Sequence, residues 1–167
     1  DLAARRRQLV ALRTAERNRR KKACHAELFA TIDAVLAVID EQIAGLDRQL
    51  AQLIATEPQW QQRDRILQSV TGVAAVTSHV LLADLPELGQ LEHKQIAKLV
   101  GVAPLNRDSG KLRGRRTIVA GRRTVRTALY MAALAAIRTV PRFKACYDAV
   151  RIRSRHAKIA IVAVARK

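Results

Sequence analysis

Residues 27–55 read ELFATIDAVLAVIDEQIAGLDRQLAQLIA, and this stretch decides the fold class of the chain. Its apolar residues recur at alternating steps of three and four over four heptads, which is the seam pattern of a coiled coil. Most of the positions between them are Asp, Glu, Gln, Arg and Ala, as expected of a solvated helix surface. Gly45 costs about 1 kcal/mol relative to Ala, too little to break four heptads. The seam is formed by Phe29, Ile32, Leu36, Ile39, Ile43, Leu46, Leu50 and Leu53.

The segment before this seam also favours a helix. Leu2, Leu9 and Leu12 lie at seam spacing, but beyond Leu12 the pattern decays into polar and basic residues. Either residues 1–24 form a second helix that folds back, or one helix runs through the polar segment, and the sequence leaves both open. At the other end, Pro58 disfavours helix in the residue before it and predicts that the coil stops there.

From Asp64 onward, short apolar segments alternate with Gly and Pro, and the sequence predicts an all-α fold. We expect a long coiled coil or helical hairpin over residues 1–57, an oligomerisation region, and a compact helical domain over residues 62–167. The connection over residues 104–121 is polar, Gly-rich and basic. A loop of that length in a compact domain is usually functional or disordered, and its charge favours function. The predicted helices are residues 62–70, 75–84, 93–100, 122–139, 141–152 and 155–166.

The charge of the chain indicates a polyanionic partner. Among 167 residues, 31 Lys and Arg stand against 14 Asp and Glu, for a formal charge of +17. Residues 5–22 and residues 138–167 each carry nine cations and one acid. The partner is therefore nucleic acid or an anionic membrane surface. Aromatic residues are too few for base stacking to dominate, which favours contact with the backbone of double-stranded DNA.

Several features bear on the compartment. No stretch approaches the roughly 20 apolar residues that a membrane span needs, so we expect no membrane partner. Cys24 and Cys146 lack metal-ligand spacing and fit a reducing cytosol. We expect a cytoplasmic protein associated with the bacterial nucleoid. The four histidines and the scattered carboxylates suggest no metal site within the chain.

Residues 66–82, ILQSVTGVAAVTSHVLL, resemble a helix-hairpin-helix unit. Such hairpins expose backbone N–H groups that grip DNA phosphates without reading sequence, and Gly72 is the candidate contact. The usual hairpin has a second glycine where this chain has Ala74, which puts the close phosphate approach in doubt. The alternative is an ordinary helical packing unit in which Gly72 ends a helix.

Residues 101–126, GVAPLNRDSGKLRGRRTIVAGRRTVR, place Ser109 within a run of cations. A serine hydroxyl that attacks phosphorus needs fixed positive charge for the developing equatorial oxygens, and guanidinium groups suit phosphate. The alternative is that Asp108-Ser109-Gly110 is an ordinary turn in a solvated basic segment. The candidate phosphate-binding residues are Lys111, Arg113, Arg115, Arg116, Arg122, Arg123 and Arg126.

Three segments in this order resemble the transposase domain of the IS110 family of bacterial insertion-sequence recombinases. They are SVTGVAAVTSHVLLADL at 69–85, KLVGVAPLNRDSGKLRGRRTI at 98–118 and GRRTVRTALYMAALAAIR at 121–138. The earlier segment ARRRQLVALRTAERNR is similar to the start of the coiled coil that joins this domain to an N-terminal RuvC-like domain.

The resemblance implies a specific chemistry. The serine nucleophile of the family falls on Ser109, which would attack a DNA phosphate and form a covalent phosphoserine link. A RuvC-like domain, missing from this chain, would hold the divalent metal, expected to be Mg²⁺. A guide (bridge) RNA and a second copy joined through the coiled coil would be further partners. The chain would then be a fragment of a DNA transposase, inactive alone.

A rival interpretation is a non-enzymatic basic coiled-coil module that binds nucleic acid. Charge and periodicity support it equally well. A scaffold that binds RNA through the basic flanks is a third possibility.

Overall fold

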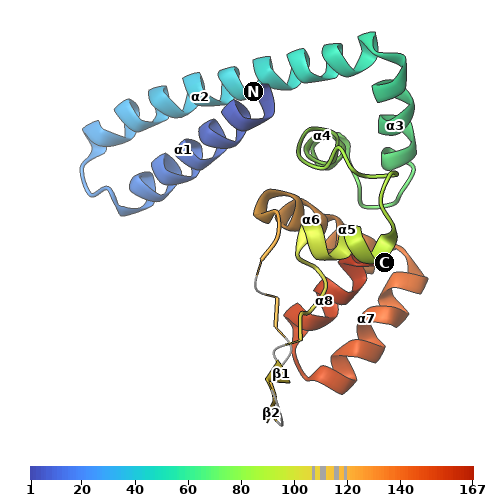
Figure 1. Ribbon diagram of the computed structural model, residues 1–167. Coiled ribbons are helices and arrows are strands. Elements are labelled where there is room, and N and C mark those ends of the chain that lie inside the picture. Colours follow the sequence, from blue (N-terminus) through green and yellow to red (C-terminus); the bar gives the residue numbers. More distant parts are fainter. Residues whose placement is uncertain (107, 110–111, 115–116, 119) are drawn as a thin grey trace. The chain divides into compact units, whose positions relative to one another are not determined.

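The chain folds into two compact units. The computed structural model describes residues 1–106, 108–109, 112–114, 117–118 and 120–167, and its units are residues 1–61, the helical hairpin, and residues 62–167, the helical domain. Both units are built from helices, so the all-α fold class predicted from the sequence is confirmed (Figure 1). None of the helices described is long and apolar enough to cross a membrane.

The helical hairpin is made by α1 (Leu2–Lys22) and α2 (Ala26–Thr56), which pack against each other along their length. Between them the backbone is extended at Ala23 and His25, which ends one helix and starts the next. Of the two possibilities that the sequence left open, residues 1–24 therefore form a second helix that folds back (Figure 1).

Three ion pairs connect the two helices of this hairpin, and we call them the arginine–aspartate ladder. The arginines lie seven residues apart on α1 and the aspartates seven apart on α2, so the pairs recur every two helical turns. Between them lies a thin apolar core of Leu9, Ile39 and Ile43. The rungs are Arg6–Asp47, Arg13–Asp40 and Arg20–Asp33.

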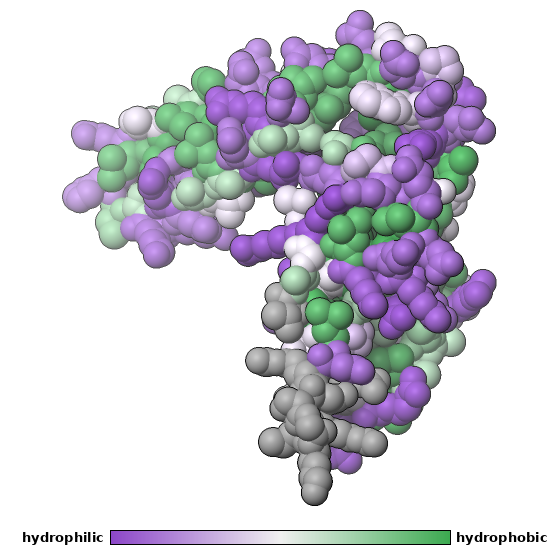
Figure 2. Space-filling model, viewed as in Figure 1, coloured by the Kyte–Doolittle hydropathy of each residue, from purple (hydrophilic) through white to green (hydrophobic). Residues whose placement is uncertain are grey.

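The predicted seam holds along most of α2 and shifts at its end. Leu53 is 47% exposed, whereas its neighbour Ile54 is only 7% exposed. The rung nearest the start of α1 is Arg6–Asp47, so the last turn of α2 extends past the start of α1. Figure 2 shows hydrophobic side chains on the outer surface of the hairpin, where Leu28, Val35 and Val38 are exposed.

In the domain, one predicted boundary is wrong. A helix was expected at residues 62–70, but α3 runs Pro58–Gln68. The proline that ends the coil also starts α3, because its fixed φ and missing N–H suit the first helical position. The remaining helices lie within two residues of prediction: α4 (Ala75–Asp84), α5 (His93–Val100), α6 (Arg123–Thr139), α7 (Pro141–Ser154) and α8 (Ala157–Ala165).

Helix α6 is the centre of the domain and contacts α4, α5, α7 and α8. Its alanines allow close packing, and Ala132, Ala133 and Ala136 are buried. On the side of α4 and α5 the core is completed by Val100 and Val125, both 0% exposed. The fully buried Ser78 hydroxyl donates a hydrogen bond of 2.5 Å to Asp64, which satisfies it inside this core.

The turn between α3 and α4 lies directly on α6. Gly72 has φ +98°, and a Cβ at this position would fall 2.5 Å from the carbonyl oxygen of Ala132. The close approach that Gly72 permits is therefore to the backbone of a helix. It fixes the predicted helix-hairpin-helix segment against the centre of the domain.

Candidate functional site

Ser109 lies on a two-stranded ribbon between α5 and α6. Strand β1 (Asp108–Ser109) pairs antiparallel with β2 (Leu112–Arg113), and Ser109 is opposite Leu112. Nearer the helices, Leu105 and Thr117 exchange backbone hydrogen bonds of 3.0 and 3.4 Å. We call residues 102–120 the Ser109 arm. The long connection predicted from the sequence thus contains paired backbone, and β1 and β2 project beyond the helices of the domain (Figure 1).

Two glycines bring the ends of the Ser109 arm together. Gly101 follows α5 with φ +79°, and Gly121 precedes α6 with φ +107°. A Cβ on Gly121 would fall 2.5 Å from the Cα of Gly101, so the two backbones touch. Only glycine allows both the left-handed backbone and this contact. The arm therefore leaves and re-enters the domain at one point.

Arg126 reinforces this point from α6. Its Nη1 donates to the carbonyl oxygen of Ala120 at 2.9 Å and to that of Gly101 at 3.4 Å. One guanidinium thus bridges the outgoing and returning ends of the arm. The side chain is half-buried and its hydrogen bonds run into the domain.

Arg122 ties the returning end to the loop after α4. Its backbone N–H donates to Leu99 at 3.1 Å, and its Nη1 donates to the carbonyl of Asp84 at 2.8 Å. Both Nη atoms bind the carboxylate of Glu87 at 2.5 Å, a bidentate ion pair. These hydrogen bonds lower the pKa of Glu87 below its ordinary value and raise that of Arg122.

The remaining predicted site residues fall into three groups. Arg123 is exposed at the first turn of α6. Ser109 and Arg113 are described through their backbone in the ribbon. Lys111, Arg115 and Arg116 lie outside the described residues. Arg122 and Arg126 thus form the base of the arm, and Arg123 and Arg113 remain on or beside it.

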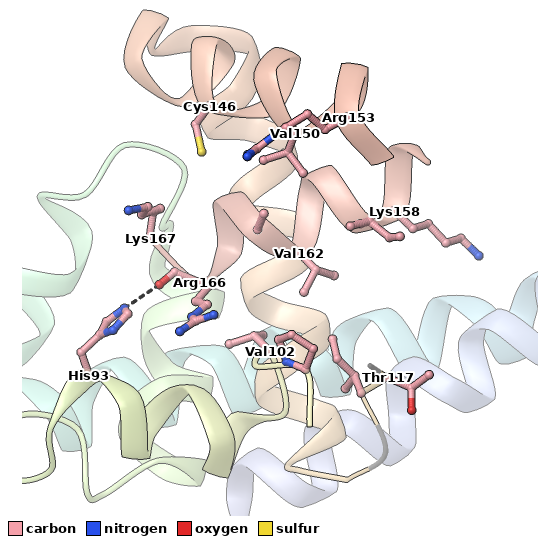
Figure 3. Close-up of a pocket in the computed structure, with 14 residues that line it drawn as sticks. His93, Val102, Thr117, Cys146, Val150, Arg153, Lys158, Val162, Arg166 and Lys167 are labelled. Atoms are coloured by element: carbon pink, nitrogen blue, oxygen red, sulfur yellow. Dashed lines mark hydrogen bonds between the residues drawn. The ribbon is translucent and has the colours of Figure 1, made fainter. Parts of the chain in front are cut away.

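A groove of about 950 Å³ runs beside the base of the Ser109 arm (Figure 3). Val102 and Thr117 contribute from the arm, and Val150 and Val162 contribute from α7 and α8. His93 Nε2 donates a hydrogen bond of 2.8 Å to the carbonyl oxygen of Arg166 along one side. The cations on its lining are Arg153, Lys158, Arg166 and Lys167, and none of the lining residues is Asp or Glu.

Sequence reasoning missed two elements of this region. One is Glu87, whose pairing with Arg122 spans 35 residues and leaves no local pattern. The other is the turn between α7 and α8, where Arg153 and Lys158 line the groove beside the arm and Ile152 is exposed. Its cations were visible as charge, but the exposure of the apolar residue depends on which face of α7 is packed.

A metal ion finds no ready site in the part of the chain that the structure describes. Over those residues no group of three or more His, Cys, Asp or Glu side chains could hold one. The described side chains therefore offer hydrogen bonding and positive charge, and these suit an anionic ligand.

A comparison with models of protein families matches the part of the chain that contains this site. Residues 64–148, just over half of the chain, match the family model described as Transposase IS116/IS110/IS902 family. The matched segment runs from α3 into α7 and contains the whole Ser109 arm. No curated protein matches the chain.

Proposed function

The chain belongs to the IS116/IS110/IS902 family of transposases, and we propose that Ser109 is the nucleophile with which it attacks DNA. A transposase of an insertion sequence cuts and rejoins DNA strands. Serine is one of the side chains that forms covalent intermediates in such transfers. The proposal assigns this role to the one hydroxyl that ends β1.

The supporting observation is the construction of the arm. Ser109 and Leu112 are the last pair of the ribbon, and its base is fixed by Gly101, Gly121 and Arg126. A reacting group at the end of a projecting ribbon reaches a DNA backbone without a concave cleft. A fixed base limits the motion of the nucleophile, which favours its orientation toward phosphorus.

The proposed step is a transesterification. The Ser109 oxygen forms a bond to phosphorus while the bond between phosphorus and the sugar oxygen breaks. The serine proton passes to a general base, and the sugar oxygen leaves with a proton, so the strand break is stored as a phosphoserine ester. A second strand end reverses the same step, and no external energy source is needed.

The cations of the arm would stabilise this reaction. Negative charge develops on the equatorial oxygens of the phosphate, and fixed guanidinium groups lower its energy. We assign this role to Arg113 and Arg123, together with Lys111, Arg115 and Arg116. Arg122 and Arg126 support the arm through the contacts described above and act as positioning residues.

The reaction would need further partners besides DNA. A RuvC-like domain would supply the divalent metal, a guide RNA would select the target, and the helical hairpin would join copies. None of the steps assigned to the described residues runs through a metal. DNA duplex is the substrate because the chain carries +17 formal charge and few aromatic residues.

The test uses Ser109→Ala in the full-length transposase, with end-labelled donor duplex. We expect the covalent protein–DNA adduct to vanish from a denaturing gel while duplex affinity stays within about threefold. Ser69→Ala is the matched control, since this exposed serine on the turn after α3 only donates to the carbonyl of Ile66. An adduct that survives Ser109→Ala would assign the nucleophile elsewhere. Binding without any adduct in the wild type would favour the non-enzymatic module.

A further inference from the structure

The turn between α7 and α8 combines strong positive charge with an exposed apolar side chain. Residues 151–158 contain four Lys or Arg and no acid. In their midst Ile152 is 78% exposed, the highest value among the large hydrophobic residues that the structure records as exposed. We call residues 151–158 the basic corner. Covering this side chain with a ligand would remove its apolar surface from water, which is favourable.

Helix α7 explains why Ile152 stands clear of the domain. Its packed face carries Phe143, Cys146 and Tyr147, which contact the core formed with α6 and α8. Ile152 lies on another face, where Ala149, three residues earlier, is exposed and small. The other neighbour on the preceding turn is Asp148, four residues earlier, which pairs with Lys144 at 3.3 Å. The isoleucine therefore extends from the last turn of the helix beside one small and one charged side chain.

Backbone strain marks the same place. Arg155 has φ +58°, and it is the one non-glycine residue with positive φ among those described. It follows the last residue of α7, a position where glycine is usual. Its N–H donates to Arg151 at 2.9 Å, and Arg151 Nη1 donates back to its carbonyl at 3.0 Å. An arginine kept in a conformation that suits glycine points to a use for its side chain.

The basic corner adjoins the Ser109 arm. Arg153 and Lys158 line the groove of about 950 Å³ together with Pro104 and Thr117 of the arm (Figure 3). A duplex held at the corner would therefore pass beside the base of the arm. Because the basic corner and the arm share this groove, one DNA duplex could contact both of them.

We propose that the basic corner binds duplex DNA, with Arg151, Arg153, Arg155 and Lys158 on phosphates and Ile152 inserted between base pairs as a wedge. Apolar wedges flanked by cations unstack a base step and bend the duplex. A protein partner would instead require a contiguous apolar patch. This inference rests on the proposed function only in taking DNA as substrate, and it does not depend on Ser109.

The test compares Ile152→Ala with Ile66→Ala, an equal truncation at a site on α3 that is 60% exposed. The full-length transposase is mixed with duplexes that carry 2-aminopurine at successive steps and a dye on each end. Wild type and Ile66→Ala should raise 2-aminopurine fluorescence at one step and bring the ends closer. Ile152→Ala should lose at least half of both signals and keep the same salt dependence of binding.

Arg155→Gly separates binding from folding. It relieves the positive φ, so the melting temperature should be unchanged or raised. The loss of one phosphate contact should reduce the slope of log K against log salt by about 0.9 and lower affinity severalfold at 150 mM salt. A purely structural arginine would leave this slope unchanged.

The outcomes are distinguishable. Equal bending by wild type and Ile152→Ala overturns the wedge. Weaker binding of a structured RNA, but not of duplex, by Arg155→Gly reassigns the corner to RNA. A duplex bent by Ile152 in a protein whose adduct survives Ser109→Ala keeps this inference and removes the proposed nucleophile.

Discussion

The helical hairpin and the helical domain use arginine in opposite ways. In the hairpin, three arginines pair with three aspartates at a constant interval, and these pairs flank a thin apolar core. In the domain, Arg126 binds two backbone carbonyls, and Arg122 binds one carbonyl and a distant carboxylate, at one crowded point. The hairpin has several equivalent contacts along its length, whereas the domain depends on one close contact between backbones. We therefore expect the hairpin to tolerate single substitutions in these contacts and the domain not to tolerate them.

The largest effect should come from the crowded point of the domain. Gly121→Ala introduces a Cβ 2.5 Å from the Cα of Gly101 at φ +107°. We expect the domain to lose about 2–4 kcal/mol of unfolding free energy, because strain and overlap add. Hydrogen exchange resolved by segment, combined with urea unfolding, measures the loss in each unit.

Two other glycines serve as matched controls for that change. Gly89→Ala carries the same left-handed strain at φ +87° with nothing within 4 Å, so about 1 kcal/mol should be lost. Gly45→Ala lies inside α2, where an added Cβ would meet only the Arg48 side chain at 4.0 Å, and it should stabilise the hairpin by up to about 1 kcal/mol. Equal losses of unfolding free energy for Gly121→Ala and Gly89→Ala would mean that the contact with Gly101 does not cause the larger loss expected at Gly121.

A smaller effect is expected in the ladder. Asp47→Arg faces Arg6 with a like charge and should cost the hairpin about 1 kcal/mol, since such partly exposed pairs contribute little. The exchange Arg6→Asp with Asp47→Arg should recover more than half of this loss. Urea unfolding at 0.1 and 1 M salt checks the cause, because salt screens the repulsion. A loss that the exchange fails to repair would mean that packing, not charge, sets the register.

The smallest effect concerns pH. Arg122 lowers the pKa of Glu87 and Arg20 lowers that of Asp33, so both folded carboxyls hold protons less tightly than in the unfolded chain. Their stabilisation is present above the ordinary carboxyl pKa and is lost as pH falls through the lowered folded value.

Replacing each carboxyl by its amide tests the pH effect separately in the domain and in the hairpin. Glu87→Gln should weaken only the domain at pH 7, and Asp33→Asn only the hairpin. Each variant should converge with the wild type as the pH falls below the carboxyl range. Unfolding midpoints of the two units from pH 7 to pH 3 provide the measurement. If a variant and the wild type still differ in unfolding midpoint at pH 3, the variant has lost packing contacts and not only a charge interaction.

Sequence patterns predicted the helices because apolar spacing and proline act locally. The seam from Phe29 to Leu50 and the bounds of α4 and α5 follow from them. The seven-residue spacing of the ladder's arginines and aspartates is present in the sequence, but their pairing was not predicted. Which arginine meets which aspartate depends on α1 folding back along α2.

The site could be predicted only in part. The position of Ser109 among cations is visible in the sequence, but the roles of Arg122 and Arg126 are not. The sequence around Arg122 does not reveal whether its side chain binds a phosphate or pairs with Glu87, which lies 35 residues earlier. The exposure of Ile152 likewise depends on which face of α7 the core covers.

The meeting of Gly101 and Gly121 has a consequence for how such an enzyme changes over time. Because both ends of the Ser109 arm attach at one place, its length is uncoupled from the spacing of α5 and α6. Inserted or exchanged residues between them would lengthen or reshape the ribbon and leave the helices in register. The arm is in this sense a replaceable cassette on an unchanged helical scaffold.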